Sequence, residues 1–161
     1  MRASPDLIDY LKRREDFSPV PYLDAAGIWT IGYGHVIRPH EKKTLTRLTE
    51  PQAELLLDQD CDPVELYLGA IQRNFKTRLS QQQFDGLVSL AFNIGLRAFE
   101  ESTLLRRVRA GDFDGAAAEF DRWIYITKKG PDGVKRKLRS RGLINRRRMD
   151  RAIFERGDYA A

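Results

Sequence analysis

The sequence predicts an α+β fold, with a small β-hairpin lobe and a mainly helical lobe on either side of a cleft. Three observations lead to this prediction: a capped helical pattern that ends near residue 15, a short segment rich in β-branched and aromatic residues up to residue 33, and helical patterns after residue 48. A length of 161 residues suits a single domain. We therefore expect one domain over 1–161, with a β-containing lobe at about 16–48 and a helical lobe at about 49–161 that packs with the first helix.

The first helix should run from about Pro5 to Glu15. Ser4 can cap it, Pro5 suits the first helical position, and the apolar residues of LIDYL recur at helical spacing. Residues 18–21 (SPVP) contain two prolines, so the helix should end before them.

A small β-hairpin is predicted next along the chain. Tyr22 and Leu23 begin it, the turn falls at residues 24–27 (DAAG), and residues 28–33 (IWTIGY) form the returning strand. Because β-branched and aromatic residues favour strands, the period changes here from helix to strand. The junction between the first helix and this hairpin is where the most informative side chains lie.

Two capping-box patterns mark helices in the remaining chain. Thr49 with Gln52 precedes AELLLDQDCD, and Ser80 with Gln83 precedes FDGLVSLAFNI. Pro63 lies within the first of these helices and should kink or interrupt it, since proline lacks the backbone N–H that the helix requires.

The last part of the chain reads as three helices and a loop. Helices are expected for TLLRRVR, for a segment that begins at the cap Asp112, and for about 143–155. Residues 127–142 are basic and interrupted by glycine, so we expect a loop there. Phe120 and Trp123 are expected in the core.

The composition is that of a globular protein with an anionic partner. The chain has 42% hydrophobic and 32% charged residues, a net charge of +5 and a pI near 9.5. From Arg122 to Arg148 there are eleven Lys or Arg residues and one acid, Asp132. Nucleic acid, anionic lipid and bacterial wall polymers all fit this charge, but the basic stretch has no base-reading motif or interleaved aromatic residues, which disfavours nucleic acid.

Cysteine, histidine and apolar segments are sparse. Cys61 is the only cysteine, so no internal disulfide can form, and its helical context predicts a buried structural thiol. His35 and His40 have no companions at ligand spacing, which argues against a metal site. The N-terminal segment lacks the apolar core of a signal peptide, and no segment approaches a transmembrane span. We therefore expect the protein to be made and folded in a cytoplasm.

Glu15, Asp24 and Thr30 form the candidate catalytic group. Glycosidic bonds are commonly hydrolysed by two carboxyl groups that lie on separate elements and face one cleft. A hydroxyl group can help to hold the attacking water. Each residue alone is ordinary: a charged helix end, a turn residue and a strand residue. Their combination across the junction favours catalysis.

Together with several motifs downstream, these residues resemble the phage-type lysozymes, the muramidase endolysins of glycoside hydrolase family 24. The resemblance covers nearly the whole chain in order. The matching motifs are TIGYGH at 30–35, AFNIG at 91–95, Phe99 with STLL at 102–105, AGDF at 110–113, Ala116 with Ala117, Trp123, Gly142 with Leu143, and Arg146 with Arg147.

Three features depart from the pattern of this family. Asp16 stands where the family usually has glycine, and two prolines follow at 19 and 21. The stretch from residue 128 to residue 141 is also longer and more basic than usual. The spacing from Glu15 to Asp24 is retained, so we expect an intact site.

The resemblance implies a lysozyme-like fold and a reaction. The β-1,4 bond between N-acetylmuramic acid and N-acetylglucosamine would be hydrolysed with inversion and without a cofactor. Glu15 would act as general acid, and the negative end of its helix favours the protonated form of a carboxyl group placed there. Asp24 and Thr30 would position and activate the water.

The resemblance also implies supporting residues. His35 would pair with an acidic group of the helical lobe, and Arg146 or Arg147 would reach Glu15. The expected saccharide contacts are Val36, Phe92, Asn93 and Ser102. Core packing remains an alternative for Phe92, and capping of the next helix remains an alternative for Ser102.

The biological role implied is host lysis at the end of a phage infection. The enzyme would act as a monomer on bacterial peptidoglycan, stay in the host cytoplasm until a holin releases it, and then reach the cell wall and periplasm. The basic region 128–148 could attract an anionic wall or outer-membrane surface. The alternative is a wall-binding or virion-associated lysozyme-like module that does not cut.

Overall fold

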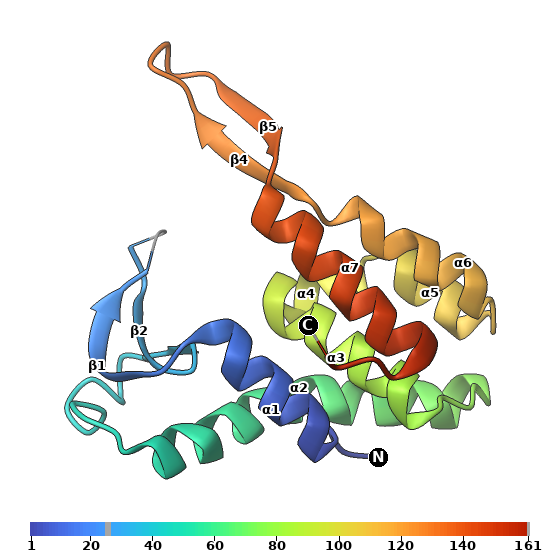
Figure 1. The fold of residues 1–161 in the computed structure, drawn as a ribbon, viewed down its shortest axis with the longest axis horizontal. Coiled ribbons are helices and arrows are strands. Elements are labelled where there is room, and N and C mark those ends of the chain that lie inside the picture. Colours follow the sequence, from blue (N-terminus) through green and yellow to red (C-terminus); the bar gives the residue numbers. More distant parts are fainter. Residues whose placement is uncertain (25–26, 161) are drawn as a thin grey trace.

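The computed structural model describes residues 1–24 and 27–160 and has an α+β architecture (Figure 1). A small sheet lies at one end, a cluster of helices lies at the other, and a long helix, α2, runs between them. The elements in chain order are α1 (Pro5–Glu15), β1 (Ser18–Leu23), β2 (Trp29–Gly32), β3 (His35–Val36), α2 (Glu50–Phe75), α3 (Gln81–Ile94), α4 (Leu96–Glu100), α5 (Thr103–Arg109), α6 (Phe113–Glu119), the 3₁₀ turn η1 (Phe120–Arg122), β4 (Tyr125–Lys129), β5 (Lys135–Arg139) and α7 (Arg141–Arg156).

The helix starts follow the predicted capping chemistry. Ser4 Oγ accepts a hydrogen bond from the N–H of Leu7 at 3.2 Å, and Gln52 Oε1 accepts one from the N–H of Thr49 at 2.9 Å. The N–H of Gln83 donates to Ser80 Oγ in the same way. These bonds satisfy N–H groups that have no partner within their own helix.

Helix α2 continues through Pro63, so the predicted interruption is wrong. Proline leaves the carbonyl of Gln59 without its helical donor. Both residues are exposed, so water can satisfy that carbonyl. The neighbouring Cys61 and Val64 are buried and hold the helix against the core. Burial raises the pKa of the Cys61 thiol to about 12, which fits the predicted structural role.

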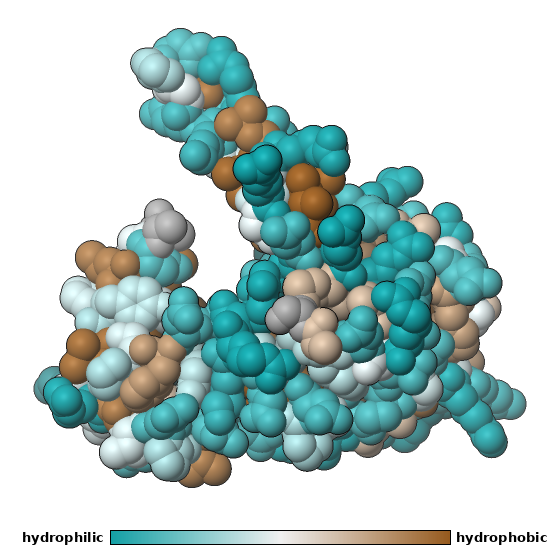
Figure 2. Space-filling view, viewed as in Figure 1, coloured by the Kyte–Doolittle hydropathy of each residue, from teal (hydrophilic) through white to brown (hydrophobic). Residues whose placement is uncertain are grey.

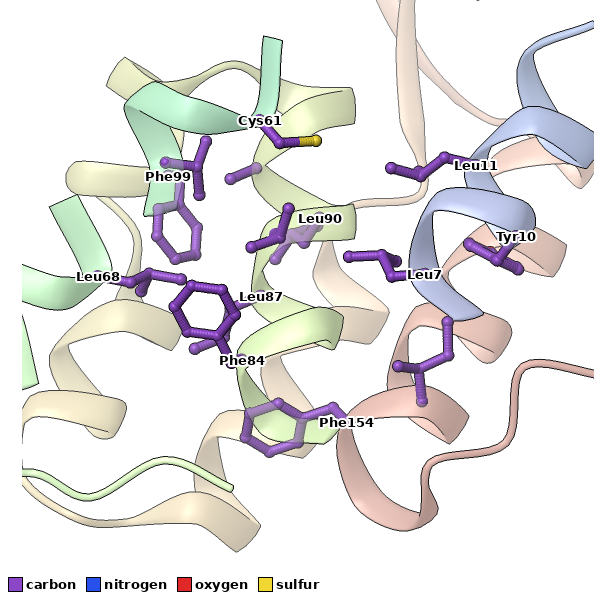
Figure 3. Packing of buried hydrophobic residues seen from close by; sticks show 14 of the residues in the cluster. Leu7, Tyr10, Leu11, Cys61, Leu68, Phe84, Leu87, Leu90, Phe99 and Phe154 are labelled. Atoms are coloured by element: carbon purple, nitrogen blue, oxygen red, sulfur yellow. The ribbon is translucent and has the colours of Figure 1, made fainter. Parts of the chain in front are cut away.

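The hydrophobic core surrounds α3, whose residues from Phe84 to Ala91 are all buried. Figure 3 shows Phe84, Leu87 and Leu90 of this helix among side chains from α1, α2, α4 and α7. Phe120 is also buried and packs on Phe154 with ring centroids 5.4 Å apart, as predicted for a core residue. None of the helices that the structure describes has the length and apolarity needed to cross a membrane.

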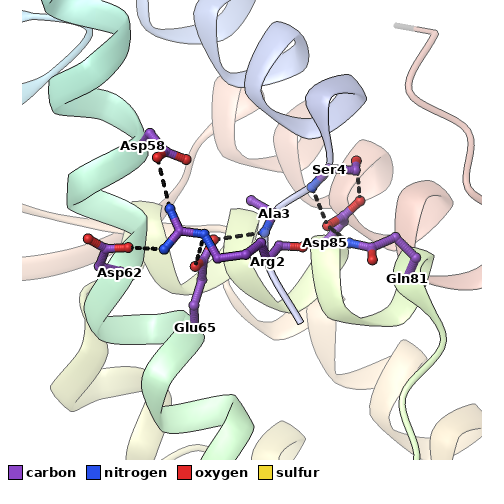
Figure 4. A network of polar contacts seen from close by, with 8 residues as sticks. All are labelled: Arg2, Ala3, Ser4, Asp58, Asp62, Glu65, Gln81 and Asp85. Atoms are coloured by element: carbon purple, nitrogen blue, oxygen red, sulfur yellow. Dashed lines mark hydrogen bonds and ion pairs between the residues drawn. The ribbon is translucent and has the colours of Figure 1, made fainter.

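A network of charges ties the N-terminus to this core (Figure 4). Arg2 forms ion pairs with Asp58 at 2.8 Å, Asp62 at 2.5 Å and Glu65 at 3.1 Å, all on α2. Ser4 Oγ donates to Asp85 of α3. The start of α1 is therefore fixed against both α2 and α3, and this fixes the position of its other end.

The predicted hairpin is part of a three-stranded antiparallel sheet with the order β1-β2-β3. The predicted turn includes residues 25 and 26, which lie outside the described part of the chain; at its edges the N–H of Gly27 donates to the carbonyl of Asp24. The two prolines of residues 18–21 lie in β1, the edge strand, where the ladder needs fewer N–H donors and the register is irregular.

A second hairpin corrects the prediction of a loop at 127–142 and of helices alone after residue 48. Strands β4 and β5 pair antiparallel over five residue pairs, and the turn between them contains Pro131 and Gly133. The hairpin projects from the helical cluster (Figure 1). The sequence hid these strands because Lys and Arg occupy both faces, so no alternation of polar and apolar residues marks them.

Candidate active site

Glu15 is the last residue of α1 and makes an ion pair with Arg146 of α7. Its Oε1 lies 2.5 Å from Arg146 Nη2, and the two side chains are only 21% and 9% exposed. The arginine expected to reach Glu15 is thus Arg146. The other carboxylate oxygen faces the β2–β3 turn, where a Cβ on Gly34 would lie 3.7 Å from Oε2. Glu15 therefore sits between the sheet and the last helix.

Asp24 and Thr30 lie on the neighbouring sheet. Asp24 Oδ1 accepts a hydrogen bond from the N–H of Ile28 at 2.8 Å, and Thr30 Oγ1 donates to the carbonyl of Ile28 at 3.1 Å. The register pairs Thr30 with Tyr22 on one side and with Val36 on the other. Directly paired residues share one face of a sheet, so these three side chains form a row next to Asp24.

The phenol of Tyr22 senses the charges of both candidate carboxylates. Partial burial raises the pKa of its phenol most, and the negative charges of Glu15, Asp24 and Asp16 raise it further. Such charge effects weaken with distance in water, so these carboxylates are the acidic groups whose charge the phenol senses. Glu15 and Arg146 thus lie at the β2–β3 turn, and Asp24 and the buried Thr30 belong to the same sheet.

Comparisons with known proteins identify the family of this chain. The phage lysozyme family profile matches residues 12–150. The chain belongs to the phage lysozyme family. It is 39% identical over 155 residues to an endolysin of Acyrthosiphon pisum secondary endosymbiont phage 1, a match that covers 96% of this chain and 99% of that protein.

Two solved structures are similar to this phage-type lysozyme. An endolysin from Escherichia coli O157:H7 phage FAHEc1 has a TM-score of 0.81 and 37% identity, and the match covers 100% of this chain and 98% of that one. The muramidase domain of SpmX from Asticaccaulis excentricus has a TM-score of 0.81 and 31% identity, with 96% and 97% covered. These likenesses confirm the resemblance, the lysozyme-like α+β fold and the assignment to glycoside hydrolases.

A buried polar group lies behind the ion pair of Glu15. Arg147 and Asp150 have no exposed side-chain surface and lie 3.0 Å apart. Ser89 Oγ donates to Asp150 at 2.6 Å, and Arg147 Nη2 donates to Asn93 Oδ1 at 2.7 Å. Burial raises the pKa of Asp150 and lowers the pKa of Arg147, because desolvation exceeds their mutual attraction. The network holds the part of α7 that carries Arg146.

His35 pairs with acidic residues on both ring nitrogens. Its Nδ1 lies 2.9 Å from Asp60 of α2, and its Nε2 lies 3.3 Å from Glu41. His35 is buried, and the hydrogen bond with Asp60 raises its pKa. This contact joins the sheet to α2 and matches the structural role that the resemblance implies. Within the described residues, no group of three or more His, Cys, Asp or Glu side chains could hold a metal ion.

Three of the four residues expected to bind saccharide line two grooves. Val36 and Phe92 line a groove of about 290 Å³ between the sheet and the end of α3. Asn93 lines another groove of about 490 Å³, hereafter the hairpin groove, together with Trp123 and residues at the base of β4–β5. Ser102 lines neither groove. It is buried, and its Oγ accepts from the N–H of Leu105 at 3.0 Å, as a helix cap does.

Three site residues escaped the sequence analysis. The sequence predicts Tyr22 only as the start of a strand, and its place beside Thr30 depends on the pairing register. Tyr125 and Lys137 line the hairpin groove because β4 pairs with β5, which sequence reasoning took for a loop. The one available signal was the Lys- and Arg-rich segment on both sides of a Gly-Pro-Asp-Gly turn.

Proposed function

We propose that this phage-type lysozyme is an endolysin that cuts the β-1,4 bond between N-acetylmuramic acid and N-acetylglucosamine in bacterial peptidoglycan. The observation that carries this proposal is the position of Glu15 at the end of α1, where one carboxylate oxygen pairs with Arg146 and the other faces the β2–β3 turn of the sheet that carries Thr30. Two carboxylates on opposite sides of one space suit acid catalysis on one face of a sugar and attack by water on the other.

Glu15 is the proposed general acid. It is held at the end of α1 against Arg146 and gives its proton to the glycosidic oxygen. The guanidinium then stabilises the carboxylate that remains, in a largely buried setting where such an interaction is stronger than in bulk water. Arg147 and Asp150 serve as positioning residues, because they fix the turn of α7 that presents Arg146.

Asp24 and Thr30 are the residues proposed to activate water. Because the Thr30 hydroxyl donates its proton to the carbonyl of Ile28, its lone pairs are turned outward to accept from a water molecule. A water that donates to Thr30 Oγ1 and to the Asp24 carboxylate directs its own lone pair at the anomeric carbon. Attack from the side opposite Glu15 inverts the configuration, provided that the two carboxyl groups stand about 6.5–9.5 Å apart around the substrate.

The wider role follows from this chemistry. The protein acts as a monomer, stays in the host cytoplasm until a holin opens the membrane, and then digests the wall at lysis. The basic region 128–148 attracts the enzyme to an anionic wall or outer-membrane surface through charges that salt screens. Val36, Phe92 and Asn93 contact the saccharide from the two grooves.

The test combines one variant with one product analysis. Glu15→Gln keeps the shape of the side chain but cannot donate the proton, so wall lysis should fall by at least about 100-fold while the thermal midpoint stays close to that of the parent. Mass spectrometry of fragments from purified peptidoglycan should show N-acetylmuramic acid at the reducing end.

Two results would refute parts of this proposal. An anhydro sugar at the reducing end would indicate a lytic transglycosylase, and then the water-activating role of Asp24 and Thr30 would be wrong. Full lysis by Glu15→Gln would remove the acid role. A parent protein that binds purified wall but releases no fragments would instead be the non-cutting wall-binding or virion-associated module.

A further inference from the structure

The second hairpin has one strongly cationic face. Cross-strand pairs place Tyr125 opposite Arg139, Thr127 opposite Lys137, and Lys129 opposite Lys135. Side chains alternate along a strand, and paired residues share a side, so these six lie on the same face. We call it the cationic face. The opposite face carries Ile126, Lys128, Arg136 and Leu138.

Among residues 1–24 and 27–160, the charges of this face have no acidic partner. Arg136, on the other face, is paired with Asp132. In the described part of the chain, no acidic side chain forms an ion pair with Lys129, Lys135, Lys137 or Arg139. Lys129 and Lys135 stand directly opposite each other, an arrangement that destabilises a hairpin. The stability of the hairpin therefore does not explain these charges, and an external anion would.

The cationic face is continuous with the hairpin groove. Tyr125, Thr127 and Lys137 belong to the face and also line the groove, next to Trp123 and Asn93. Asn93 accepts from Arg147, which adjoins the arginine that holds Glu15. Figure 2 shows an open notch between this projecting hairpin and the first sheet. A ligand that lies on the cationic face thus continues into a groove that reaches Asn93, at the end of α3.

We propose that the cationic face and the hairpin groove bind the acidic peptides attached to the glycan strand that is being cut. This proposal rests on the proposed function and extends it from the sugar to the substituents of the sugar. Peptides with free carboxylates complement four unpaired cations, while Trp123 and Tyr125 offer apolar surface to the chain between the carboxylates. A planar lipid surface fits less well, because the cationic face borders a groove.

The test measures binding by an inactive protein, so that cleavage does not remove the ligand. In a Glu15→Gln background, calorimetry would compare soluble glycan fragments with their peptides and the same fragments after an amidase has removed the peptides. The hairpin variant carries Lys129→Gln, Lys135→Gln and Arg139→Gln. The matched control carries Arg73→Gln, Lys76→Gln and Arg78→Gln, which removes three exposed and unpaired cations at the far end of α2.

The unaltered hairpin should bind the peptide-bearing fragments about tenfold more tightly than the stripped ones, since each exposed charge contact adds only modestly to the affinity. This preference should weaken with salt, disappear in the hairpin variant and persist in the control. It should be present when Lys129 and Lys135 are replaced by Arg instead of Gln, because arginine keeps the positive charge. All changed side chains of the hairpin variant are exposed, so its thermal midpoint should stay near that of the control.

The proposal is overturned if the hairpin variant keeps the preference, if it loses stripped and peptide-bearing fragments equally, or if the hairpin matters only for binding to vesicles of anionic phospholipid. Each of these results leaves the proposed function intact provided that the protein with Glu15 restored still cuts purified peptidoglycan. Failure of that cutting would count against the proposed function instead.

Discussion

The two β-hairpins border the same open notch but are held in opposite ways (Figure 2). In the first sheet, Ile31 has no exposed surface, Tyr33 is 4% exposed, and Gly32 packs closely against Ala53 of α2. In the second hairpin every residue of β5 is exposed, and the strands are held mainly by their own ladder.

This difference in packing fits the roles proposed for the two hairpins. In the proposed mechanism Asp24 and Thr30 keep a fixed geometry relative to Glu15, and packing against a core gives such precision. The cationic face acts through charges over a longer range, which tolerate some freedom of the strands. The first hairpin is therefore built into the core, whereas the second is attached beside it.

The largest expected effect is on the packing of the first sheet. Ile31→Ala should lower the free energy of unfolding by about 2–5 kcal/mol, because it leaves a cavity between the sheet and the core. Leu138→Ala in β5 should change it by no more than about 0.5 kcal/mol, since that side chain is 45% exposed. Urea denaturation measures both. Equal losses would show that the second hairpin is also part of the cooperative core.

A pair of glycines sharpens the same comparison. Gly32 and Gly133 have positive φ angles of 66° and 77°, so alanine at either position should cost about 1–2 kcal/mol in backbone strain. At Gly32 the new Cβ would also lie 3.0 Å from the Cβ of Ala53, which adds an overpacking cost of about 1–3 kcal/mol. At Gly133 the closest side chain is the flexible Lys129.

The measurement for these glycines must separate local from global effects. Gly32→Ala should lower the midpoint of global unfolding and reduce catalysis. Gly133→Ala should increase amide exchange within β4–β5 and leave the global midpoint nearly unchanged. A global loss for Gly133→Ala as large as that for Gly32→Ala would contradict the view that the second hairpin is only attached to the core.

The same contrast explains which of the two hairpins can be predicted from the sequence. The first hairpin was found because IWTIGY has the composition of a strand with a turn before it, and Glu15, Asp24 and Thr30 follow from motif and spacing. The second was missed because its strands carry charges on both faces and gain their order from pairing.

The burial of charged side chains is equally difficult to predict from the sequence. From the sequence, either Arg146 or Arg147 is expected to reach Glu15, whereas the side chain of Arg147 has no exposed surface and pairs with Asp150 one helical turn later. The site triad depends on local patterns, whereas Tyr22 and the buried pair depend on which elements meet. Strand register and helix packing decide which elements meet, and no local motif specifies either of them.

The joint between α1 and the first sheet is expected to be strained. Asp16 has φ 52° and ψ 144°, a region that glycine occupies far more readily than aspartate. Asp16→Gly should therefore raise the free energy of unfolding by about 1–2 kcal/mol. Lys76→Gly is the control, because its left-handed φ of 51° lies at the end of α2, far from the site, and should gain about 1 kcal/mol at most.

Activity assays distinguish the two stabilised variants, Asp16→Gly and Lys76→Gly. Because Asp16 lies beside Glu15 and near Tyr22, its replacement should change the pH profile of lysis, whereas Lys76→Gly should leave the profile as it is. Thermal denaturation and turbidity assays across pH give both readouts. A loss of stability in Asp16→Gly would mean that contacts of the aspartate outweigh its backbone strain.

The smallest expected effect is a pH dependence confined to the first sheet. The pKa of His35 is raised above its ordinary value of 6.5, chiefly by the hydrogen bond with Asp60 and further by Glu41. A raised folded pKa means that the native state holds the proton more tightly than the unfolded state. The stabilisation is therefore complete below about pH 6.5 and is lost as the pH rises through the folded value.

Asp60→Asn should flatten this dependence, because the amide carries no charge to hold the proton on His35. Urea denaturation between pH 5 and pH 9 should show a fall in stability with rising pH in the parent and a smaller fall in the variant. His40 is 73% exposed and serves as the control: His40→Ala should leave the slope unchanged. The second hairpin contains no histidine, so amide exchange within it, corrected for the intrinsic effect of pH, should not follow this transition. If it did, the two hairpins would share one cooperative unit, and the contrast in how they are held would be wrong.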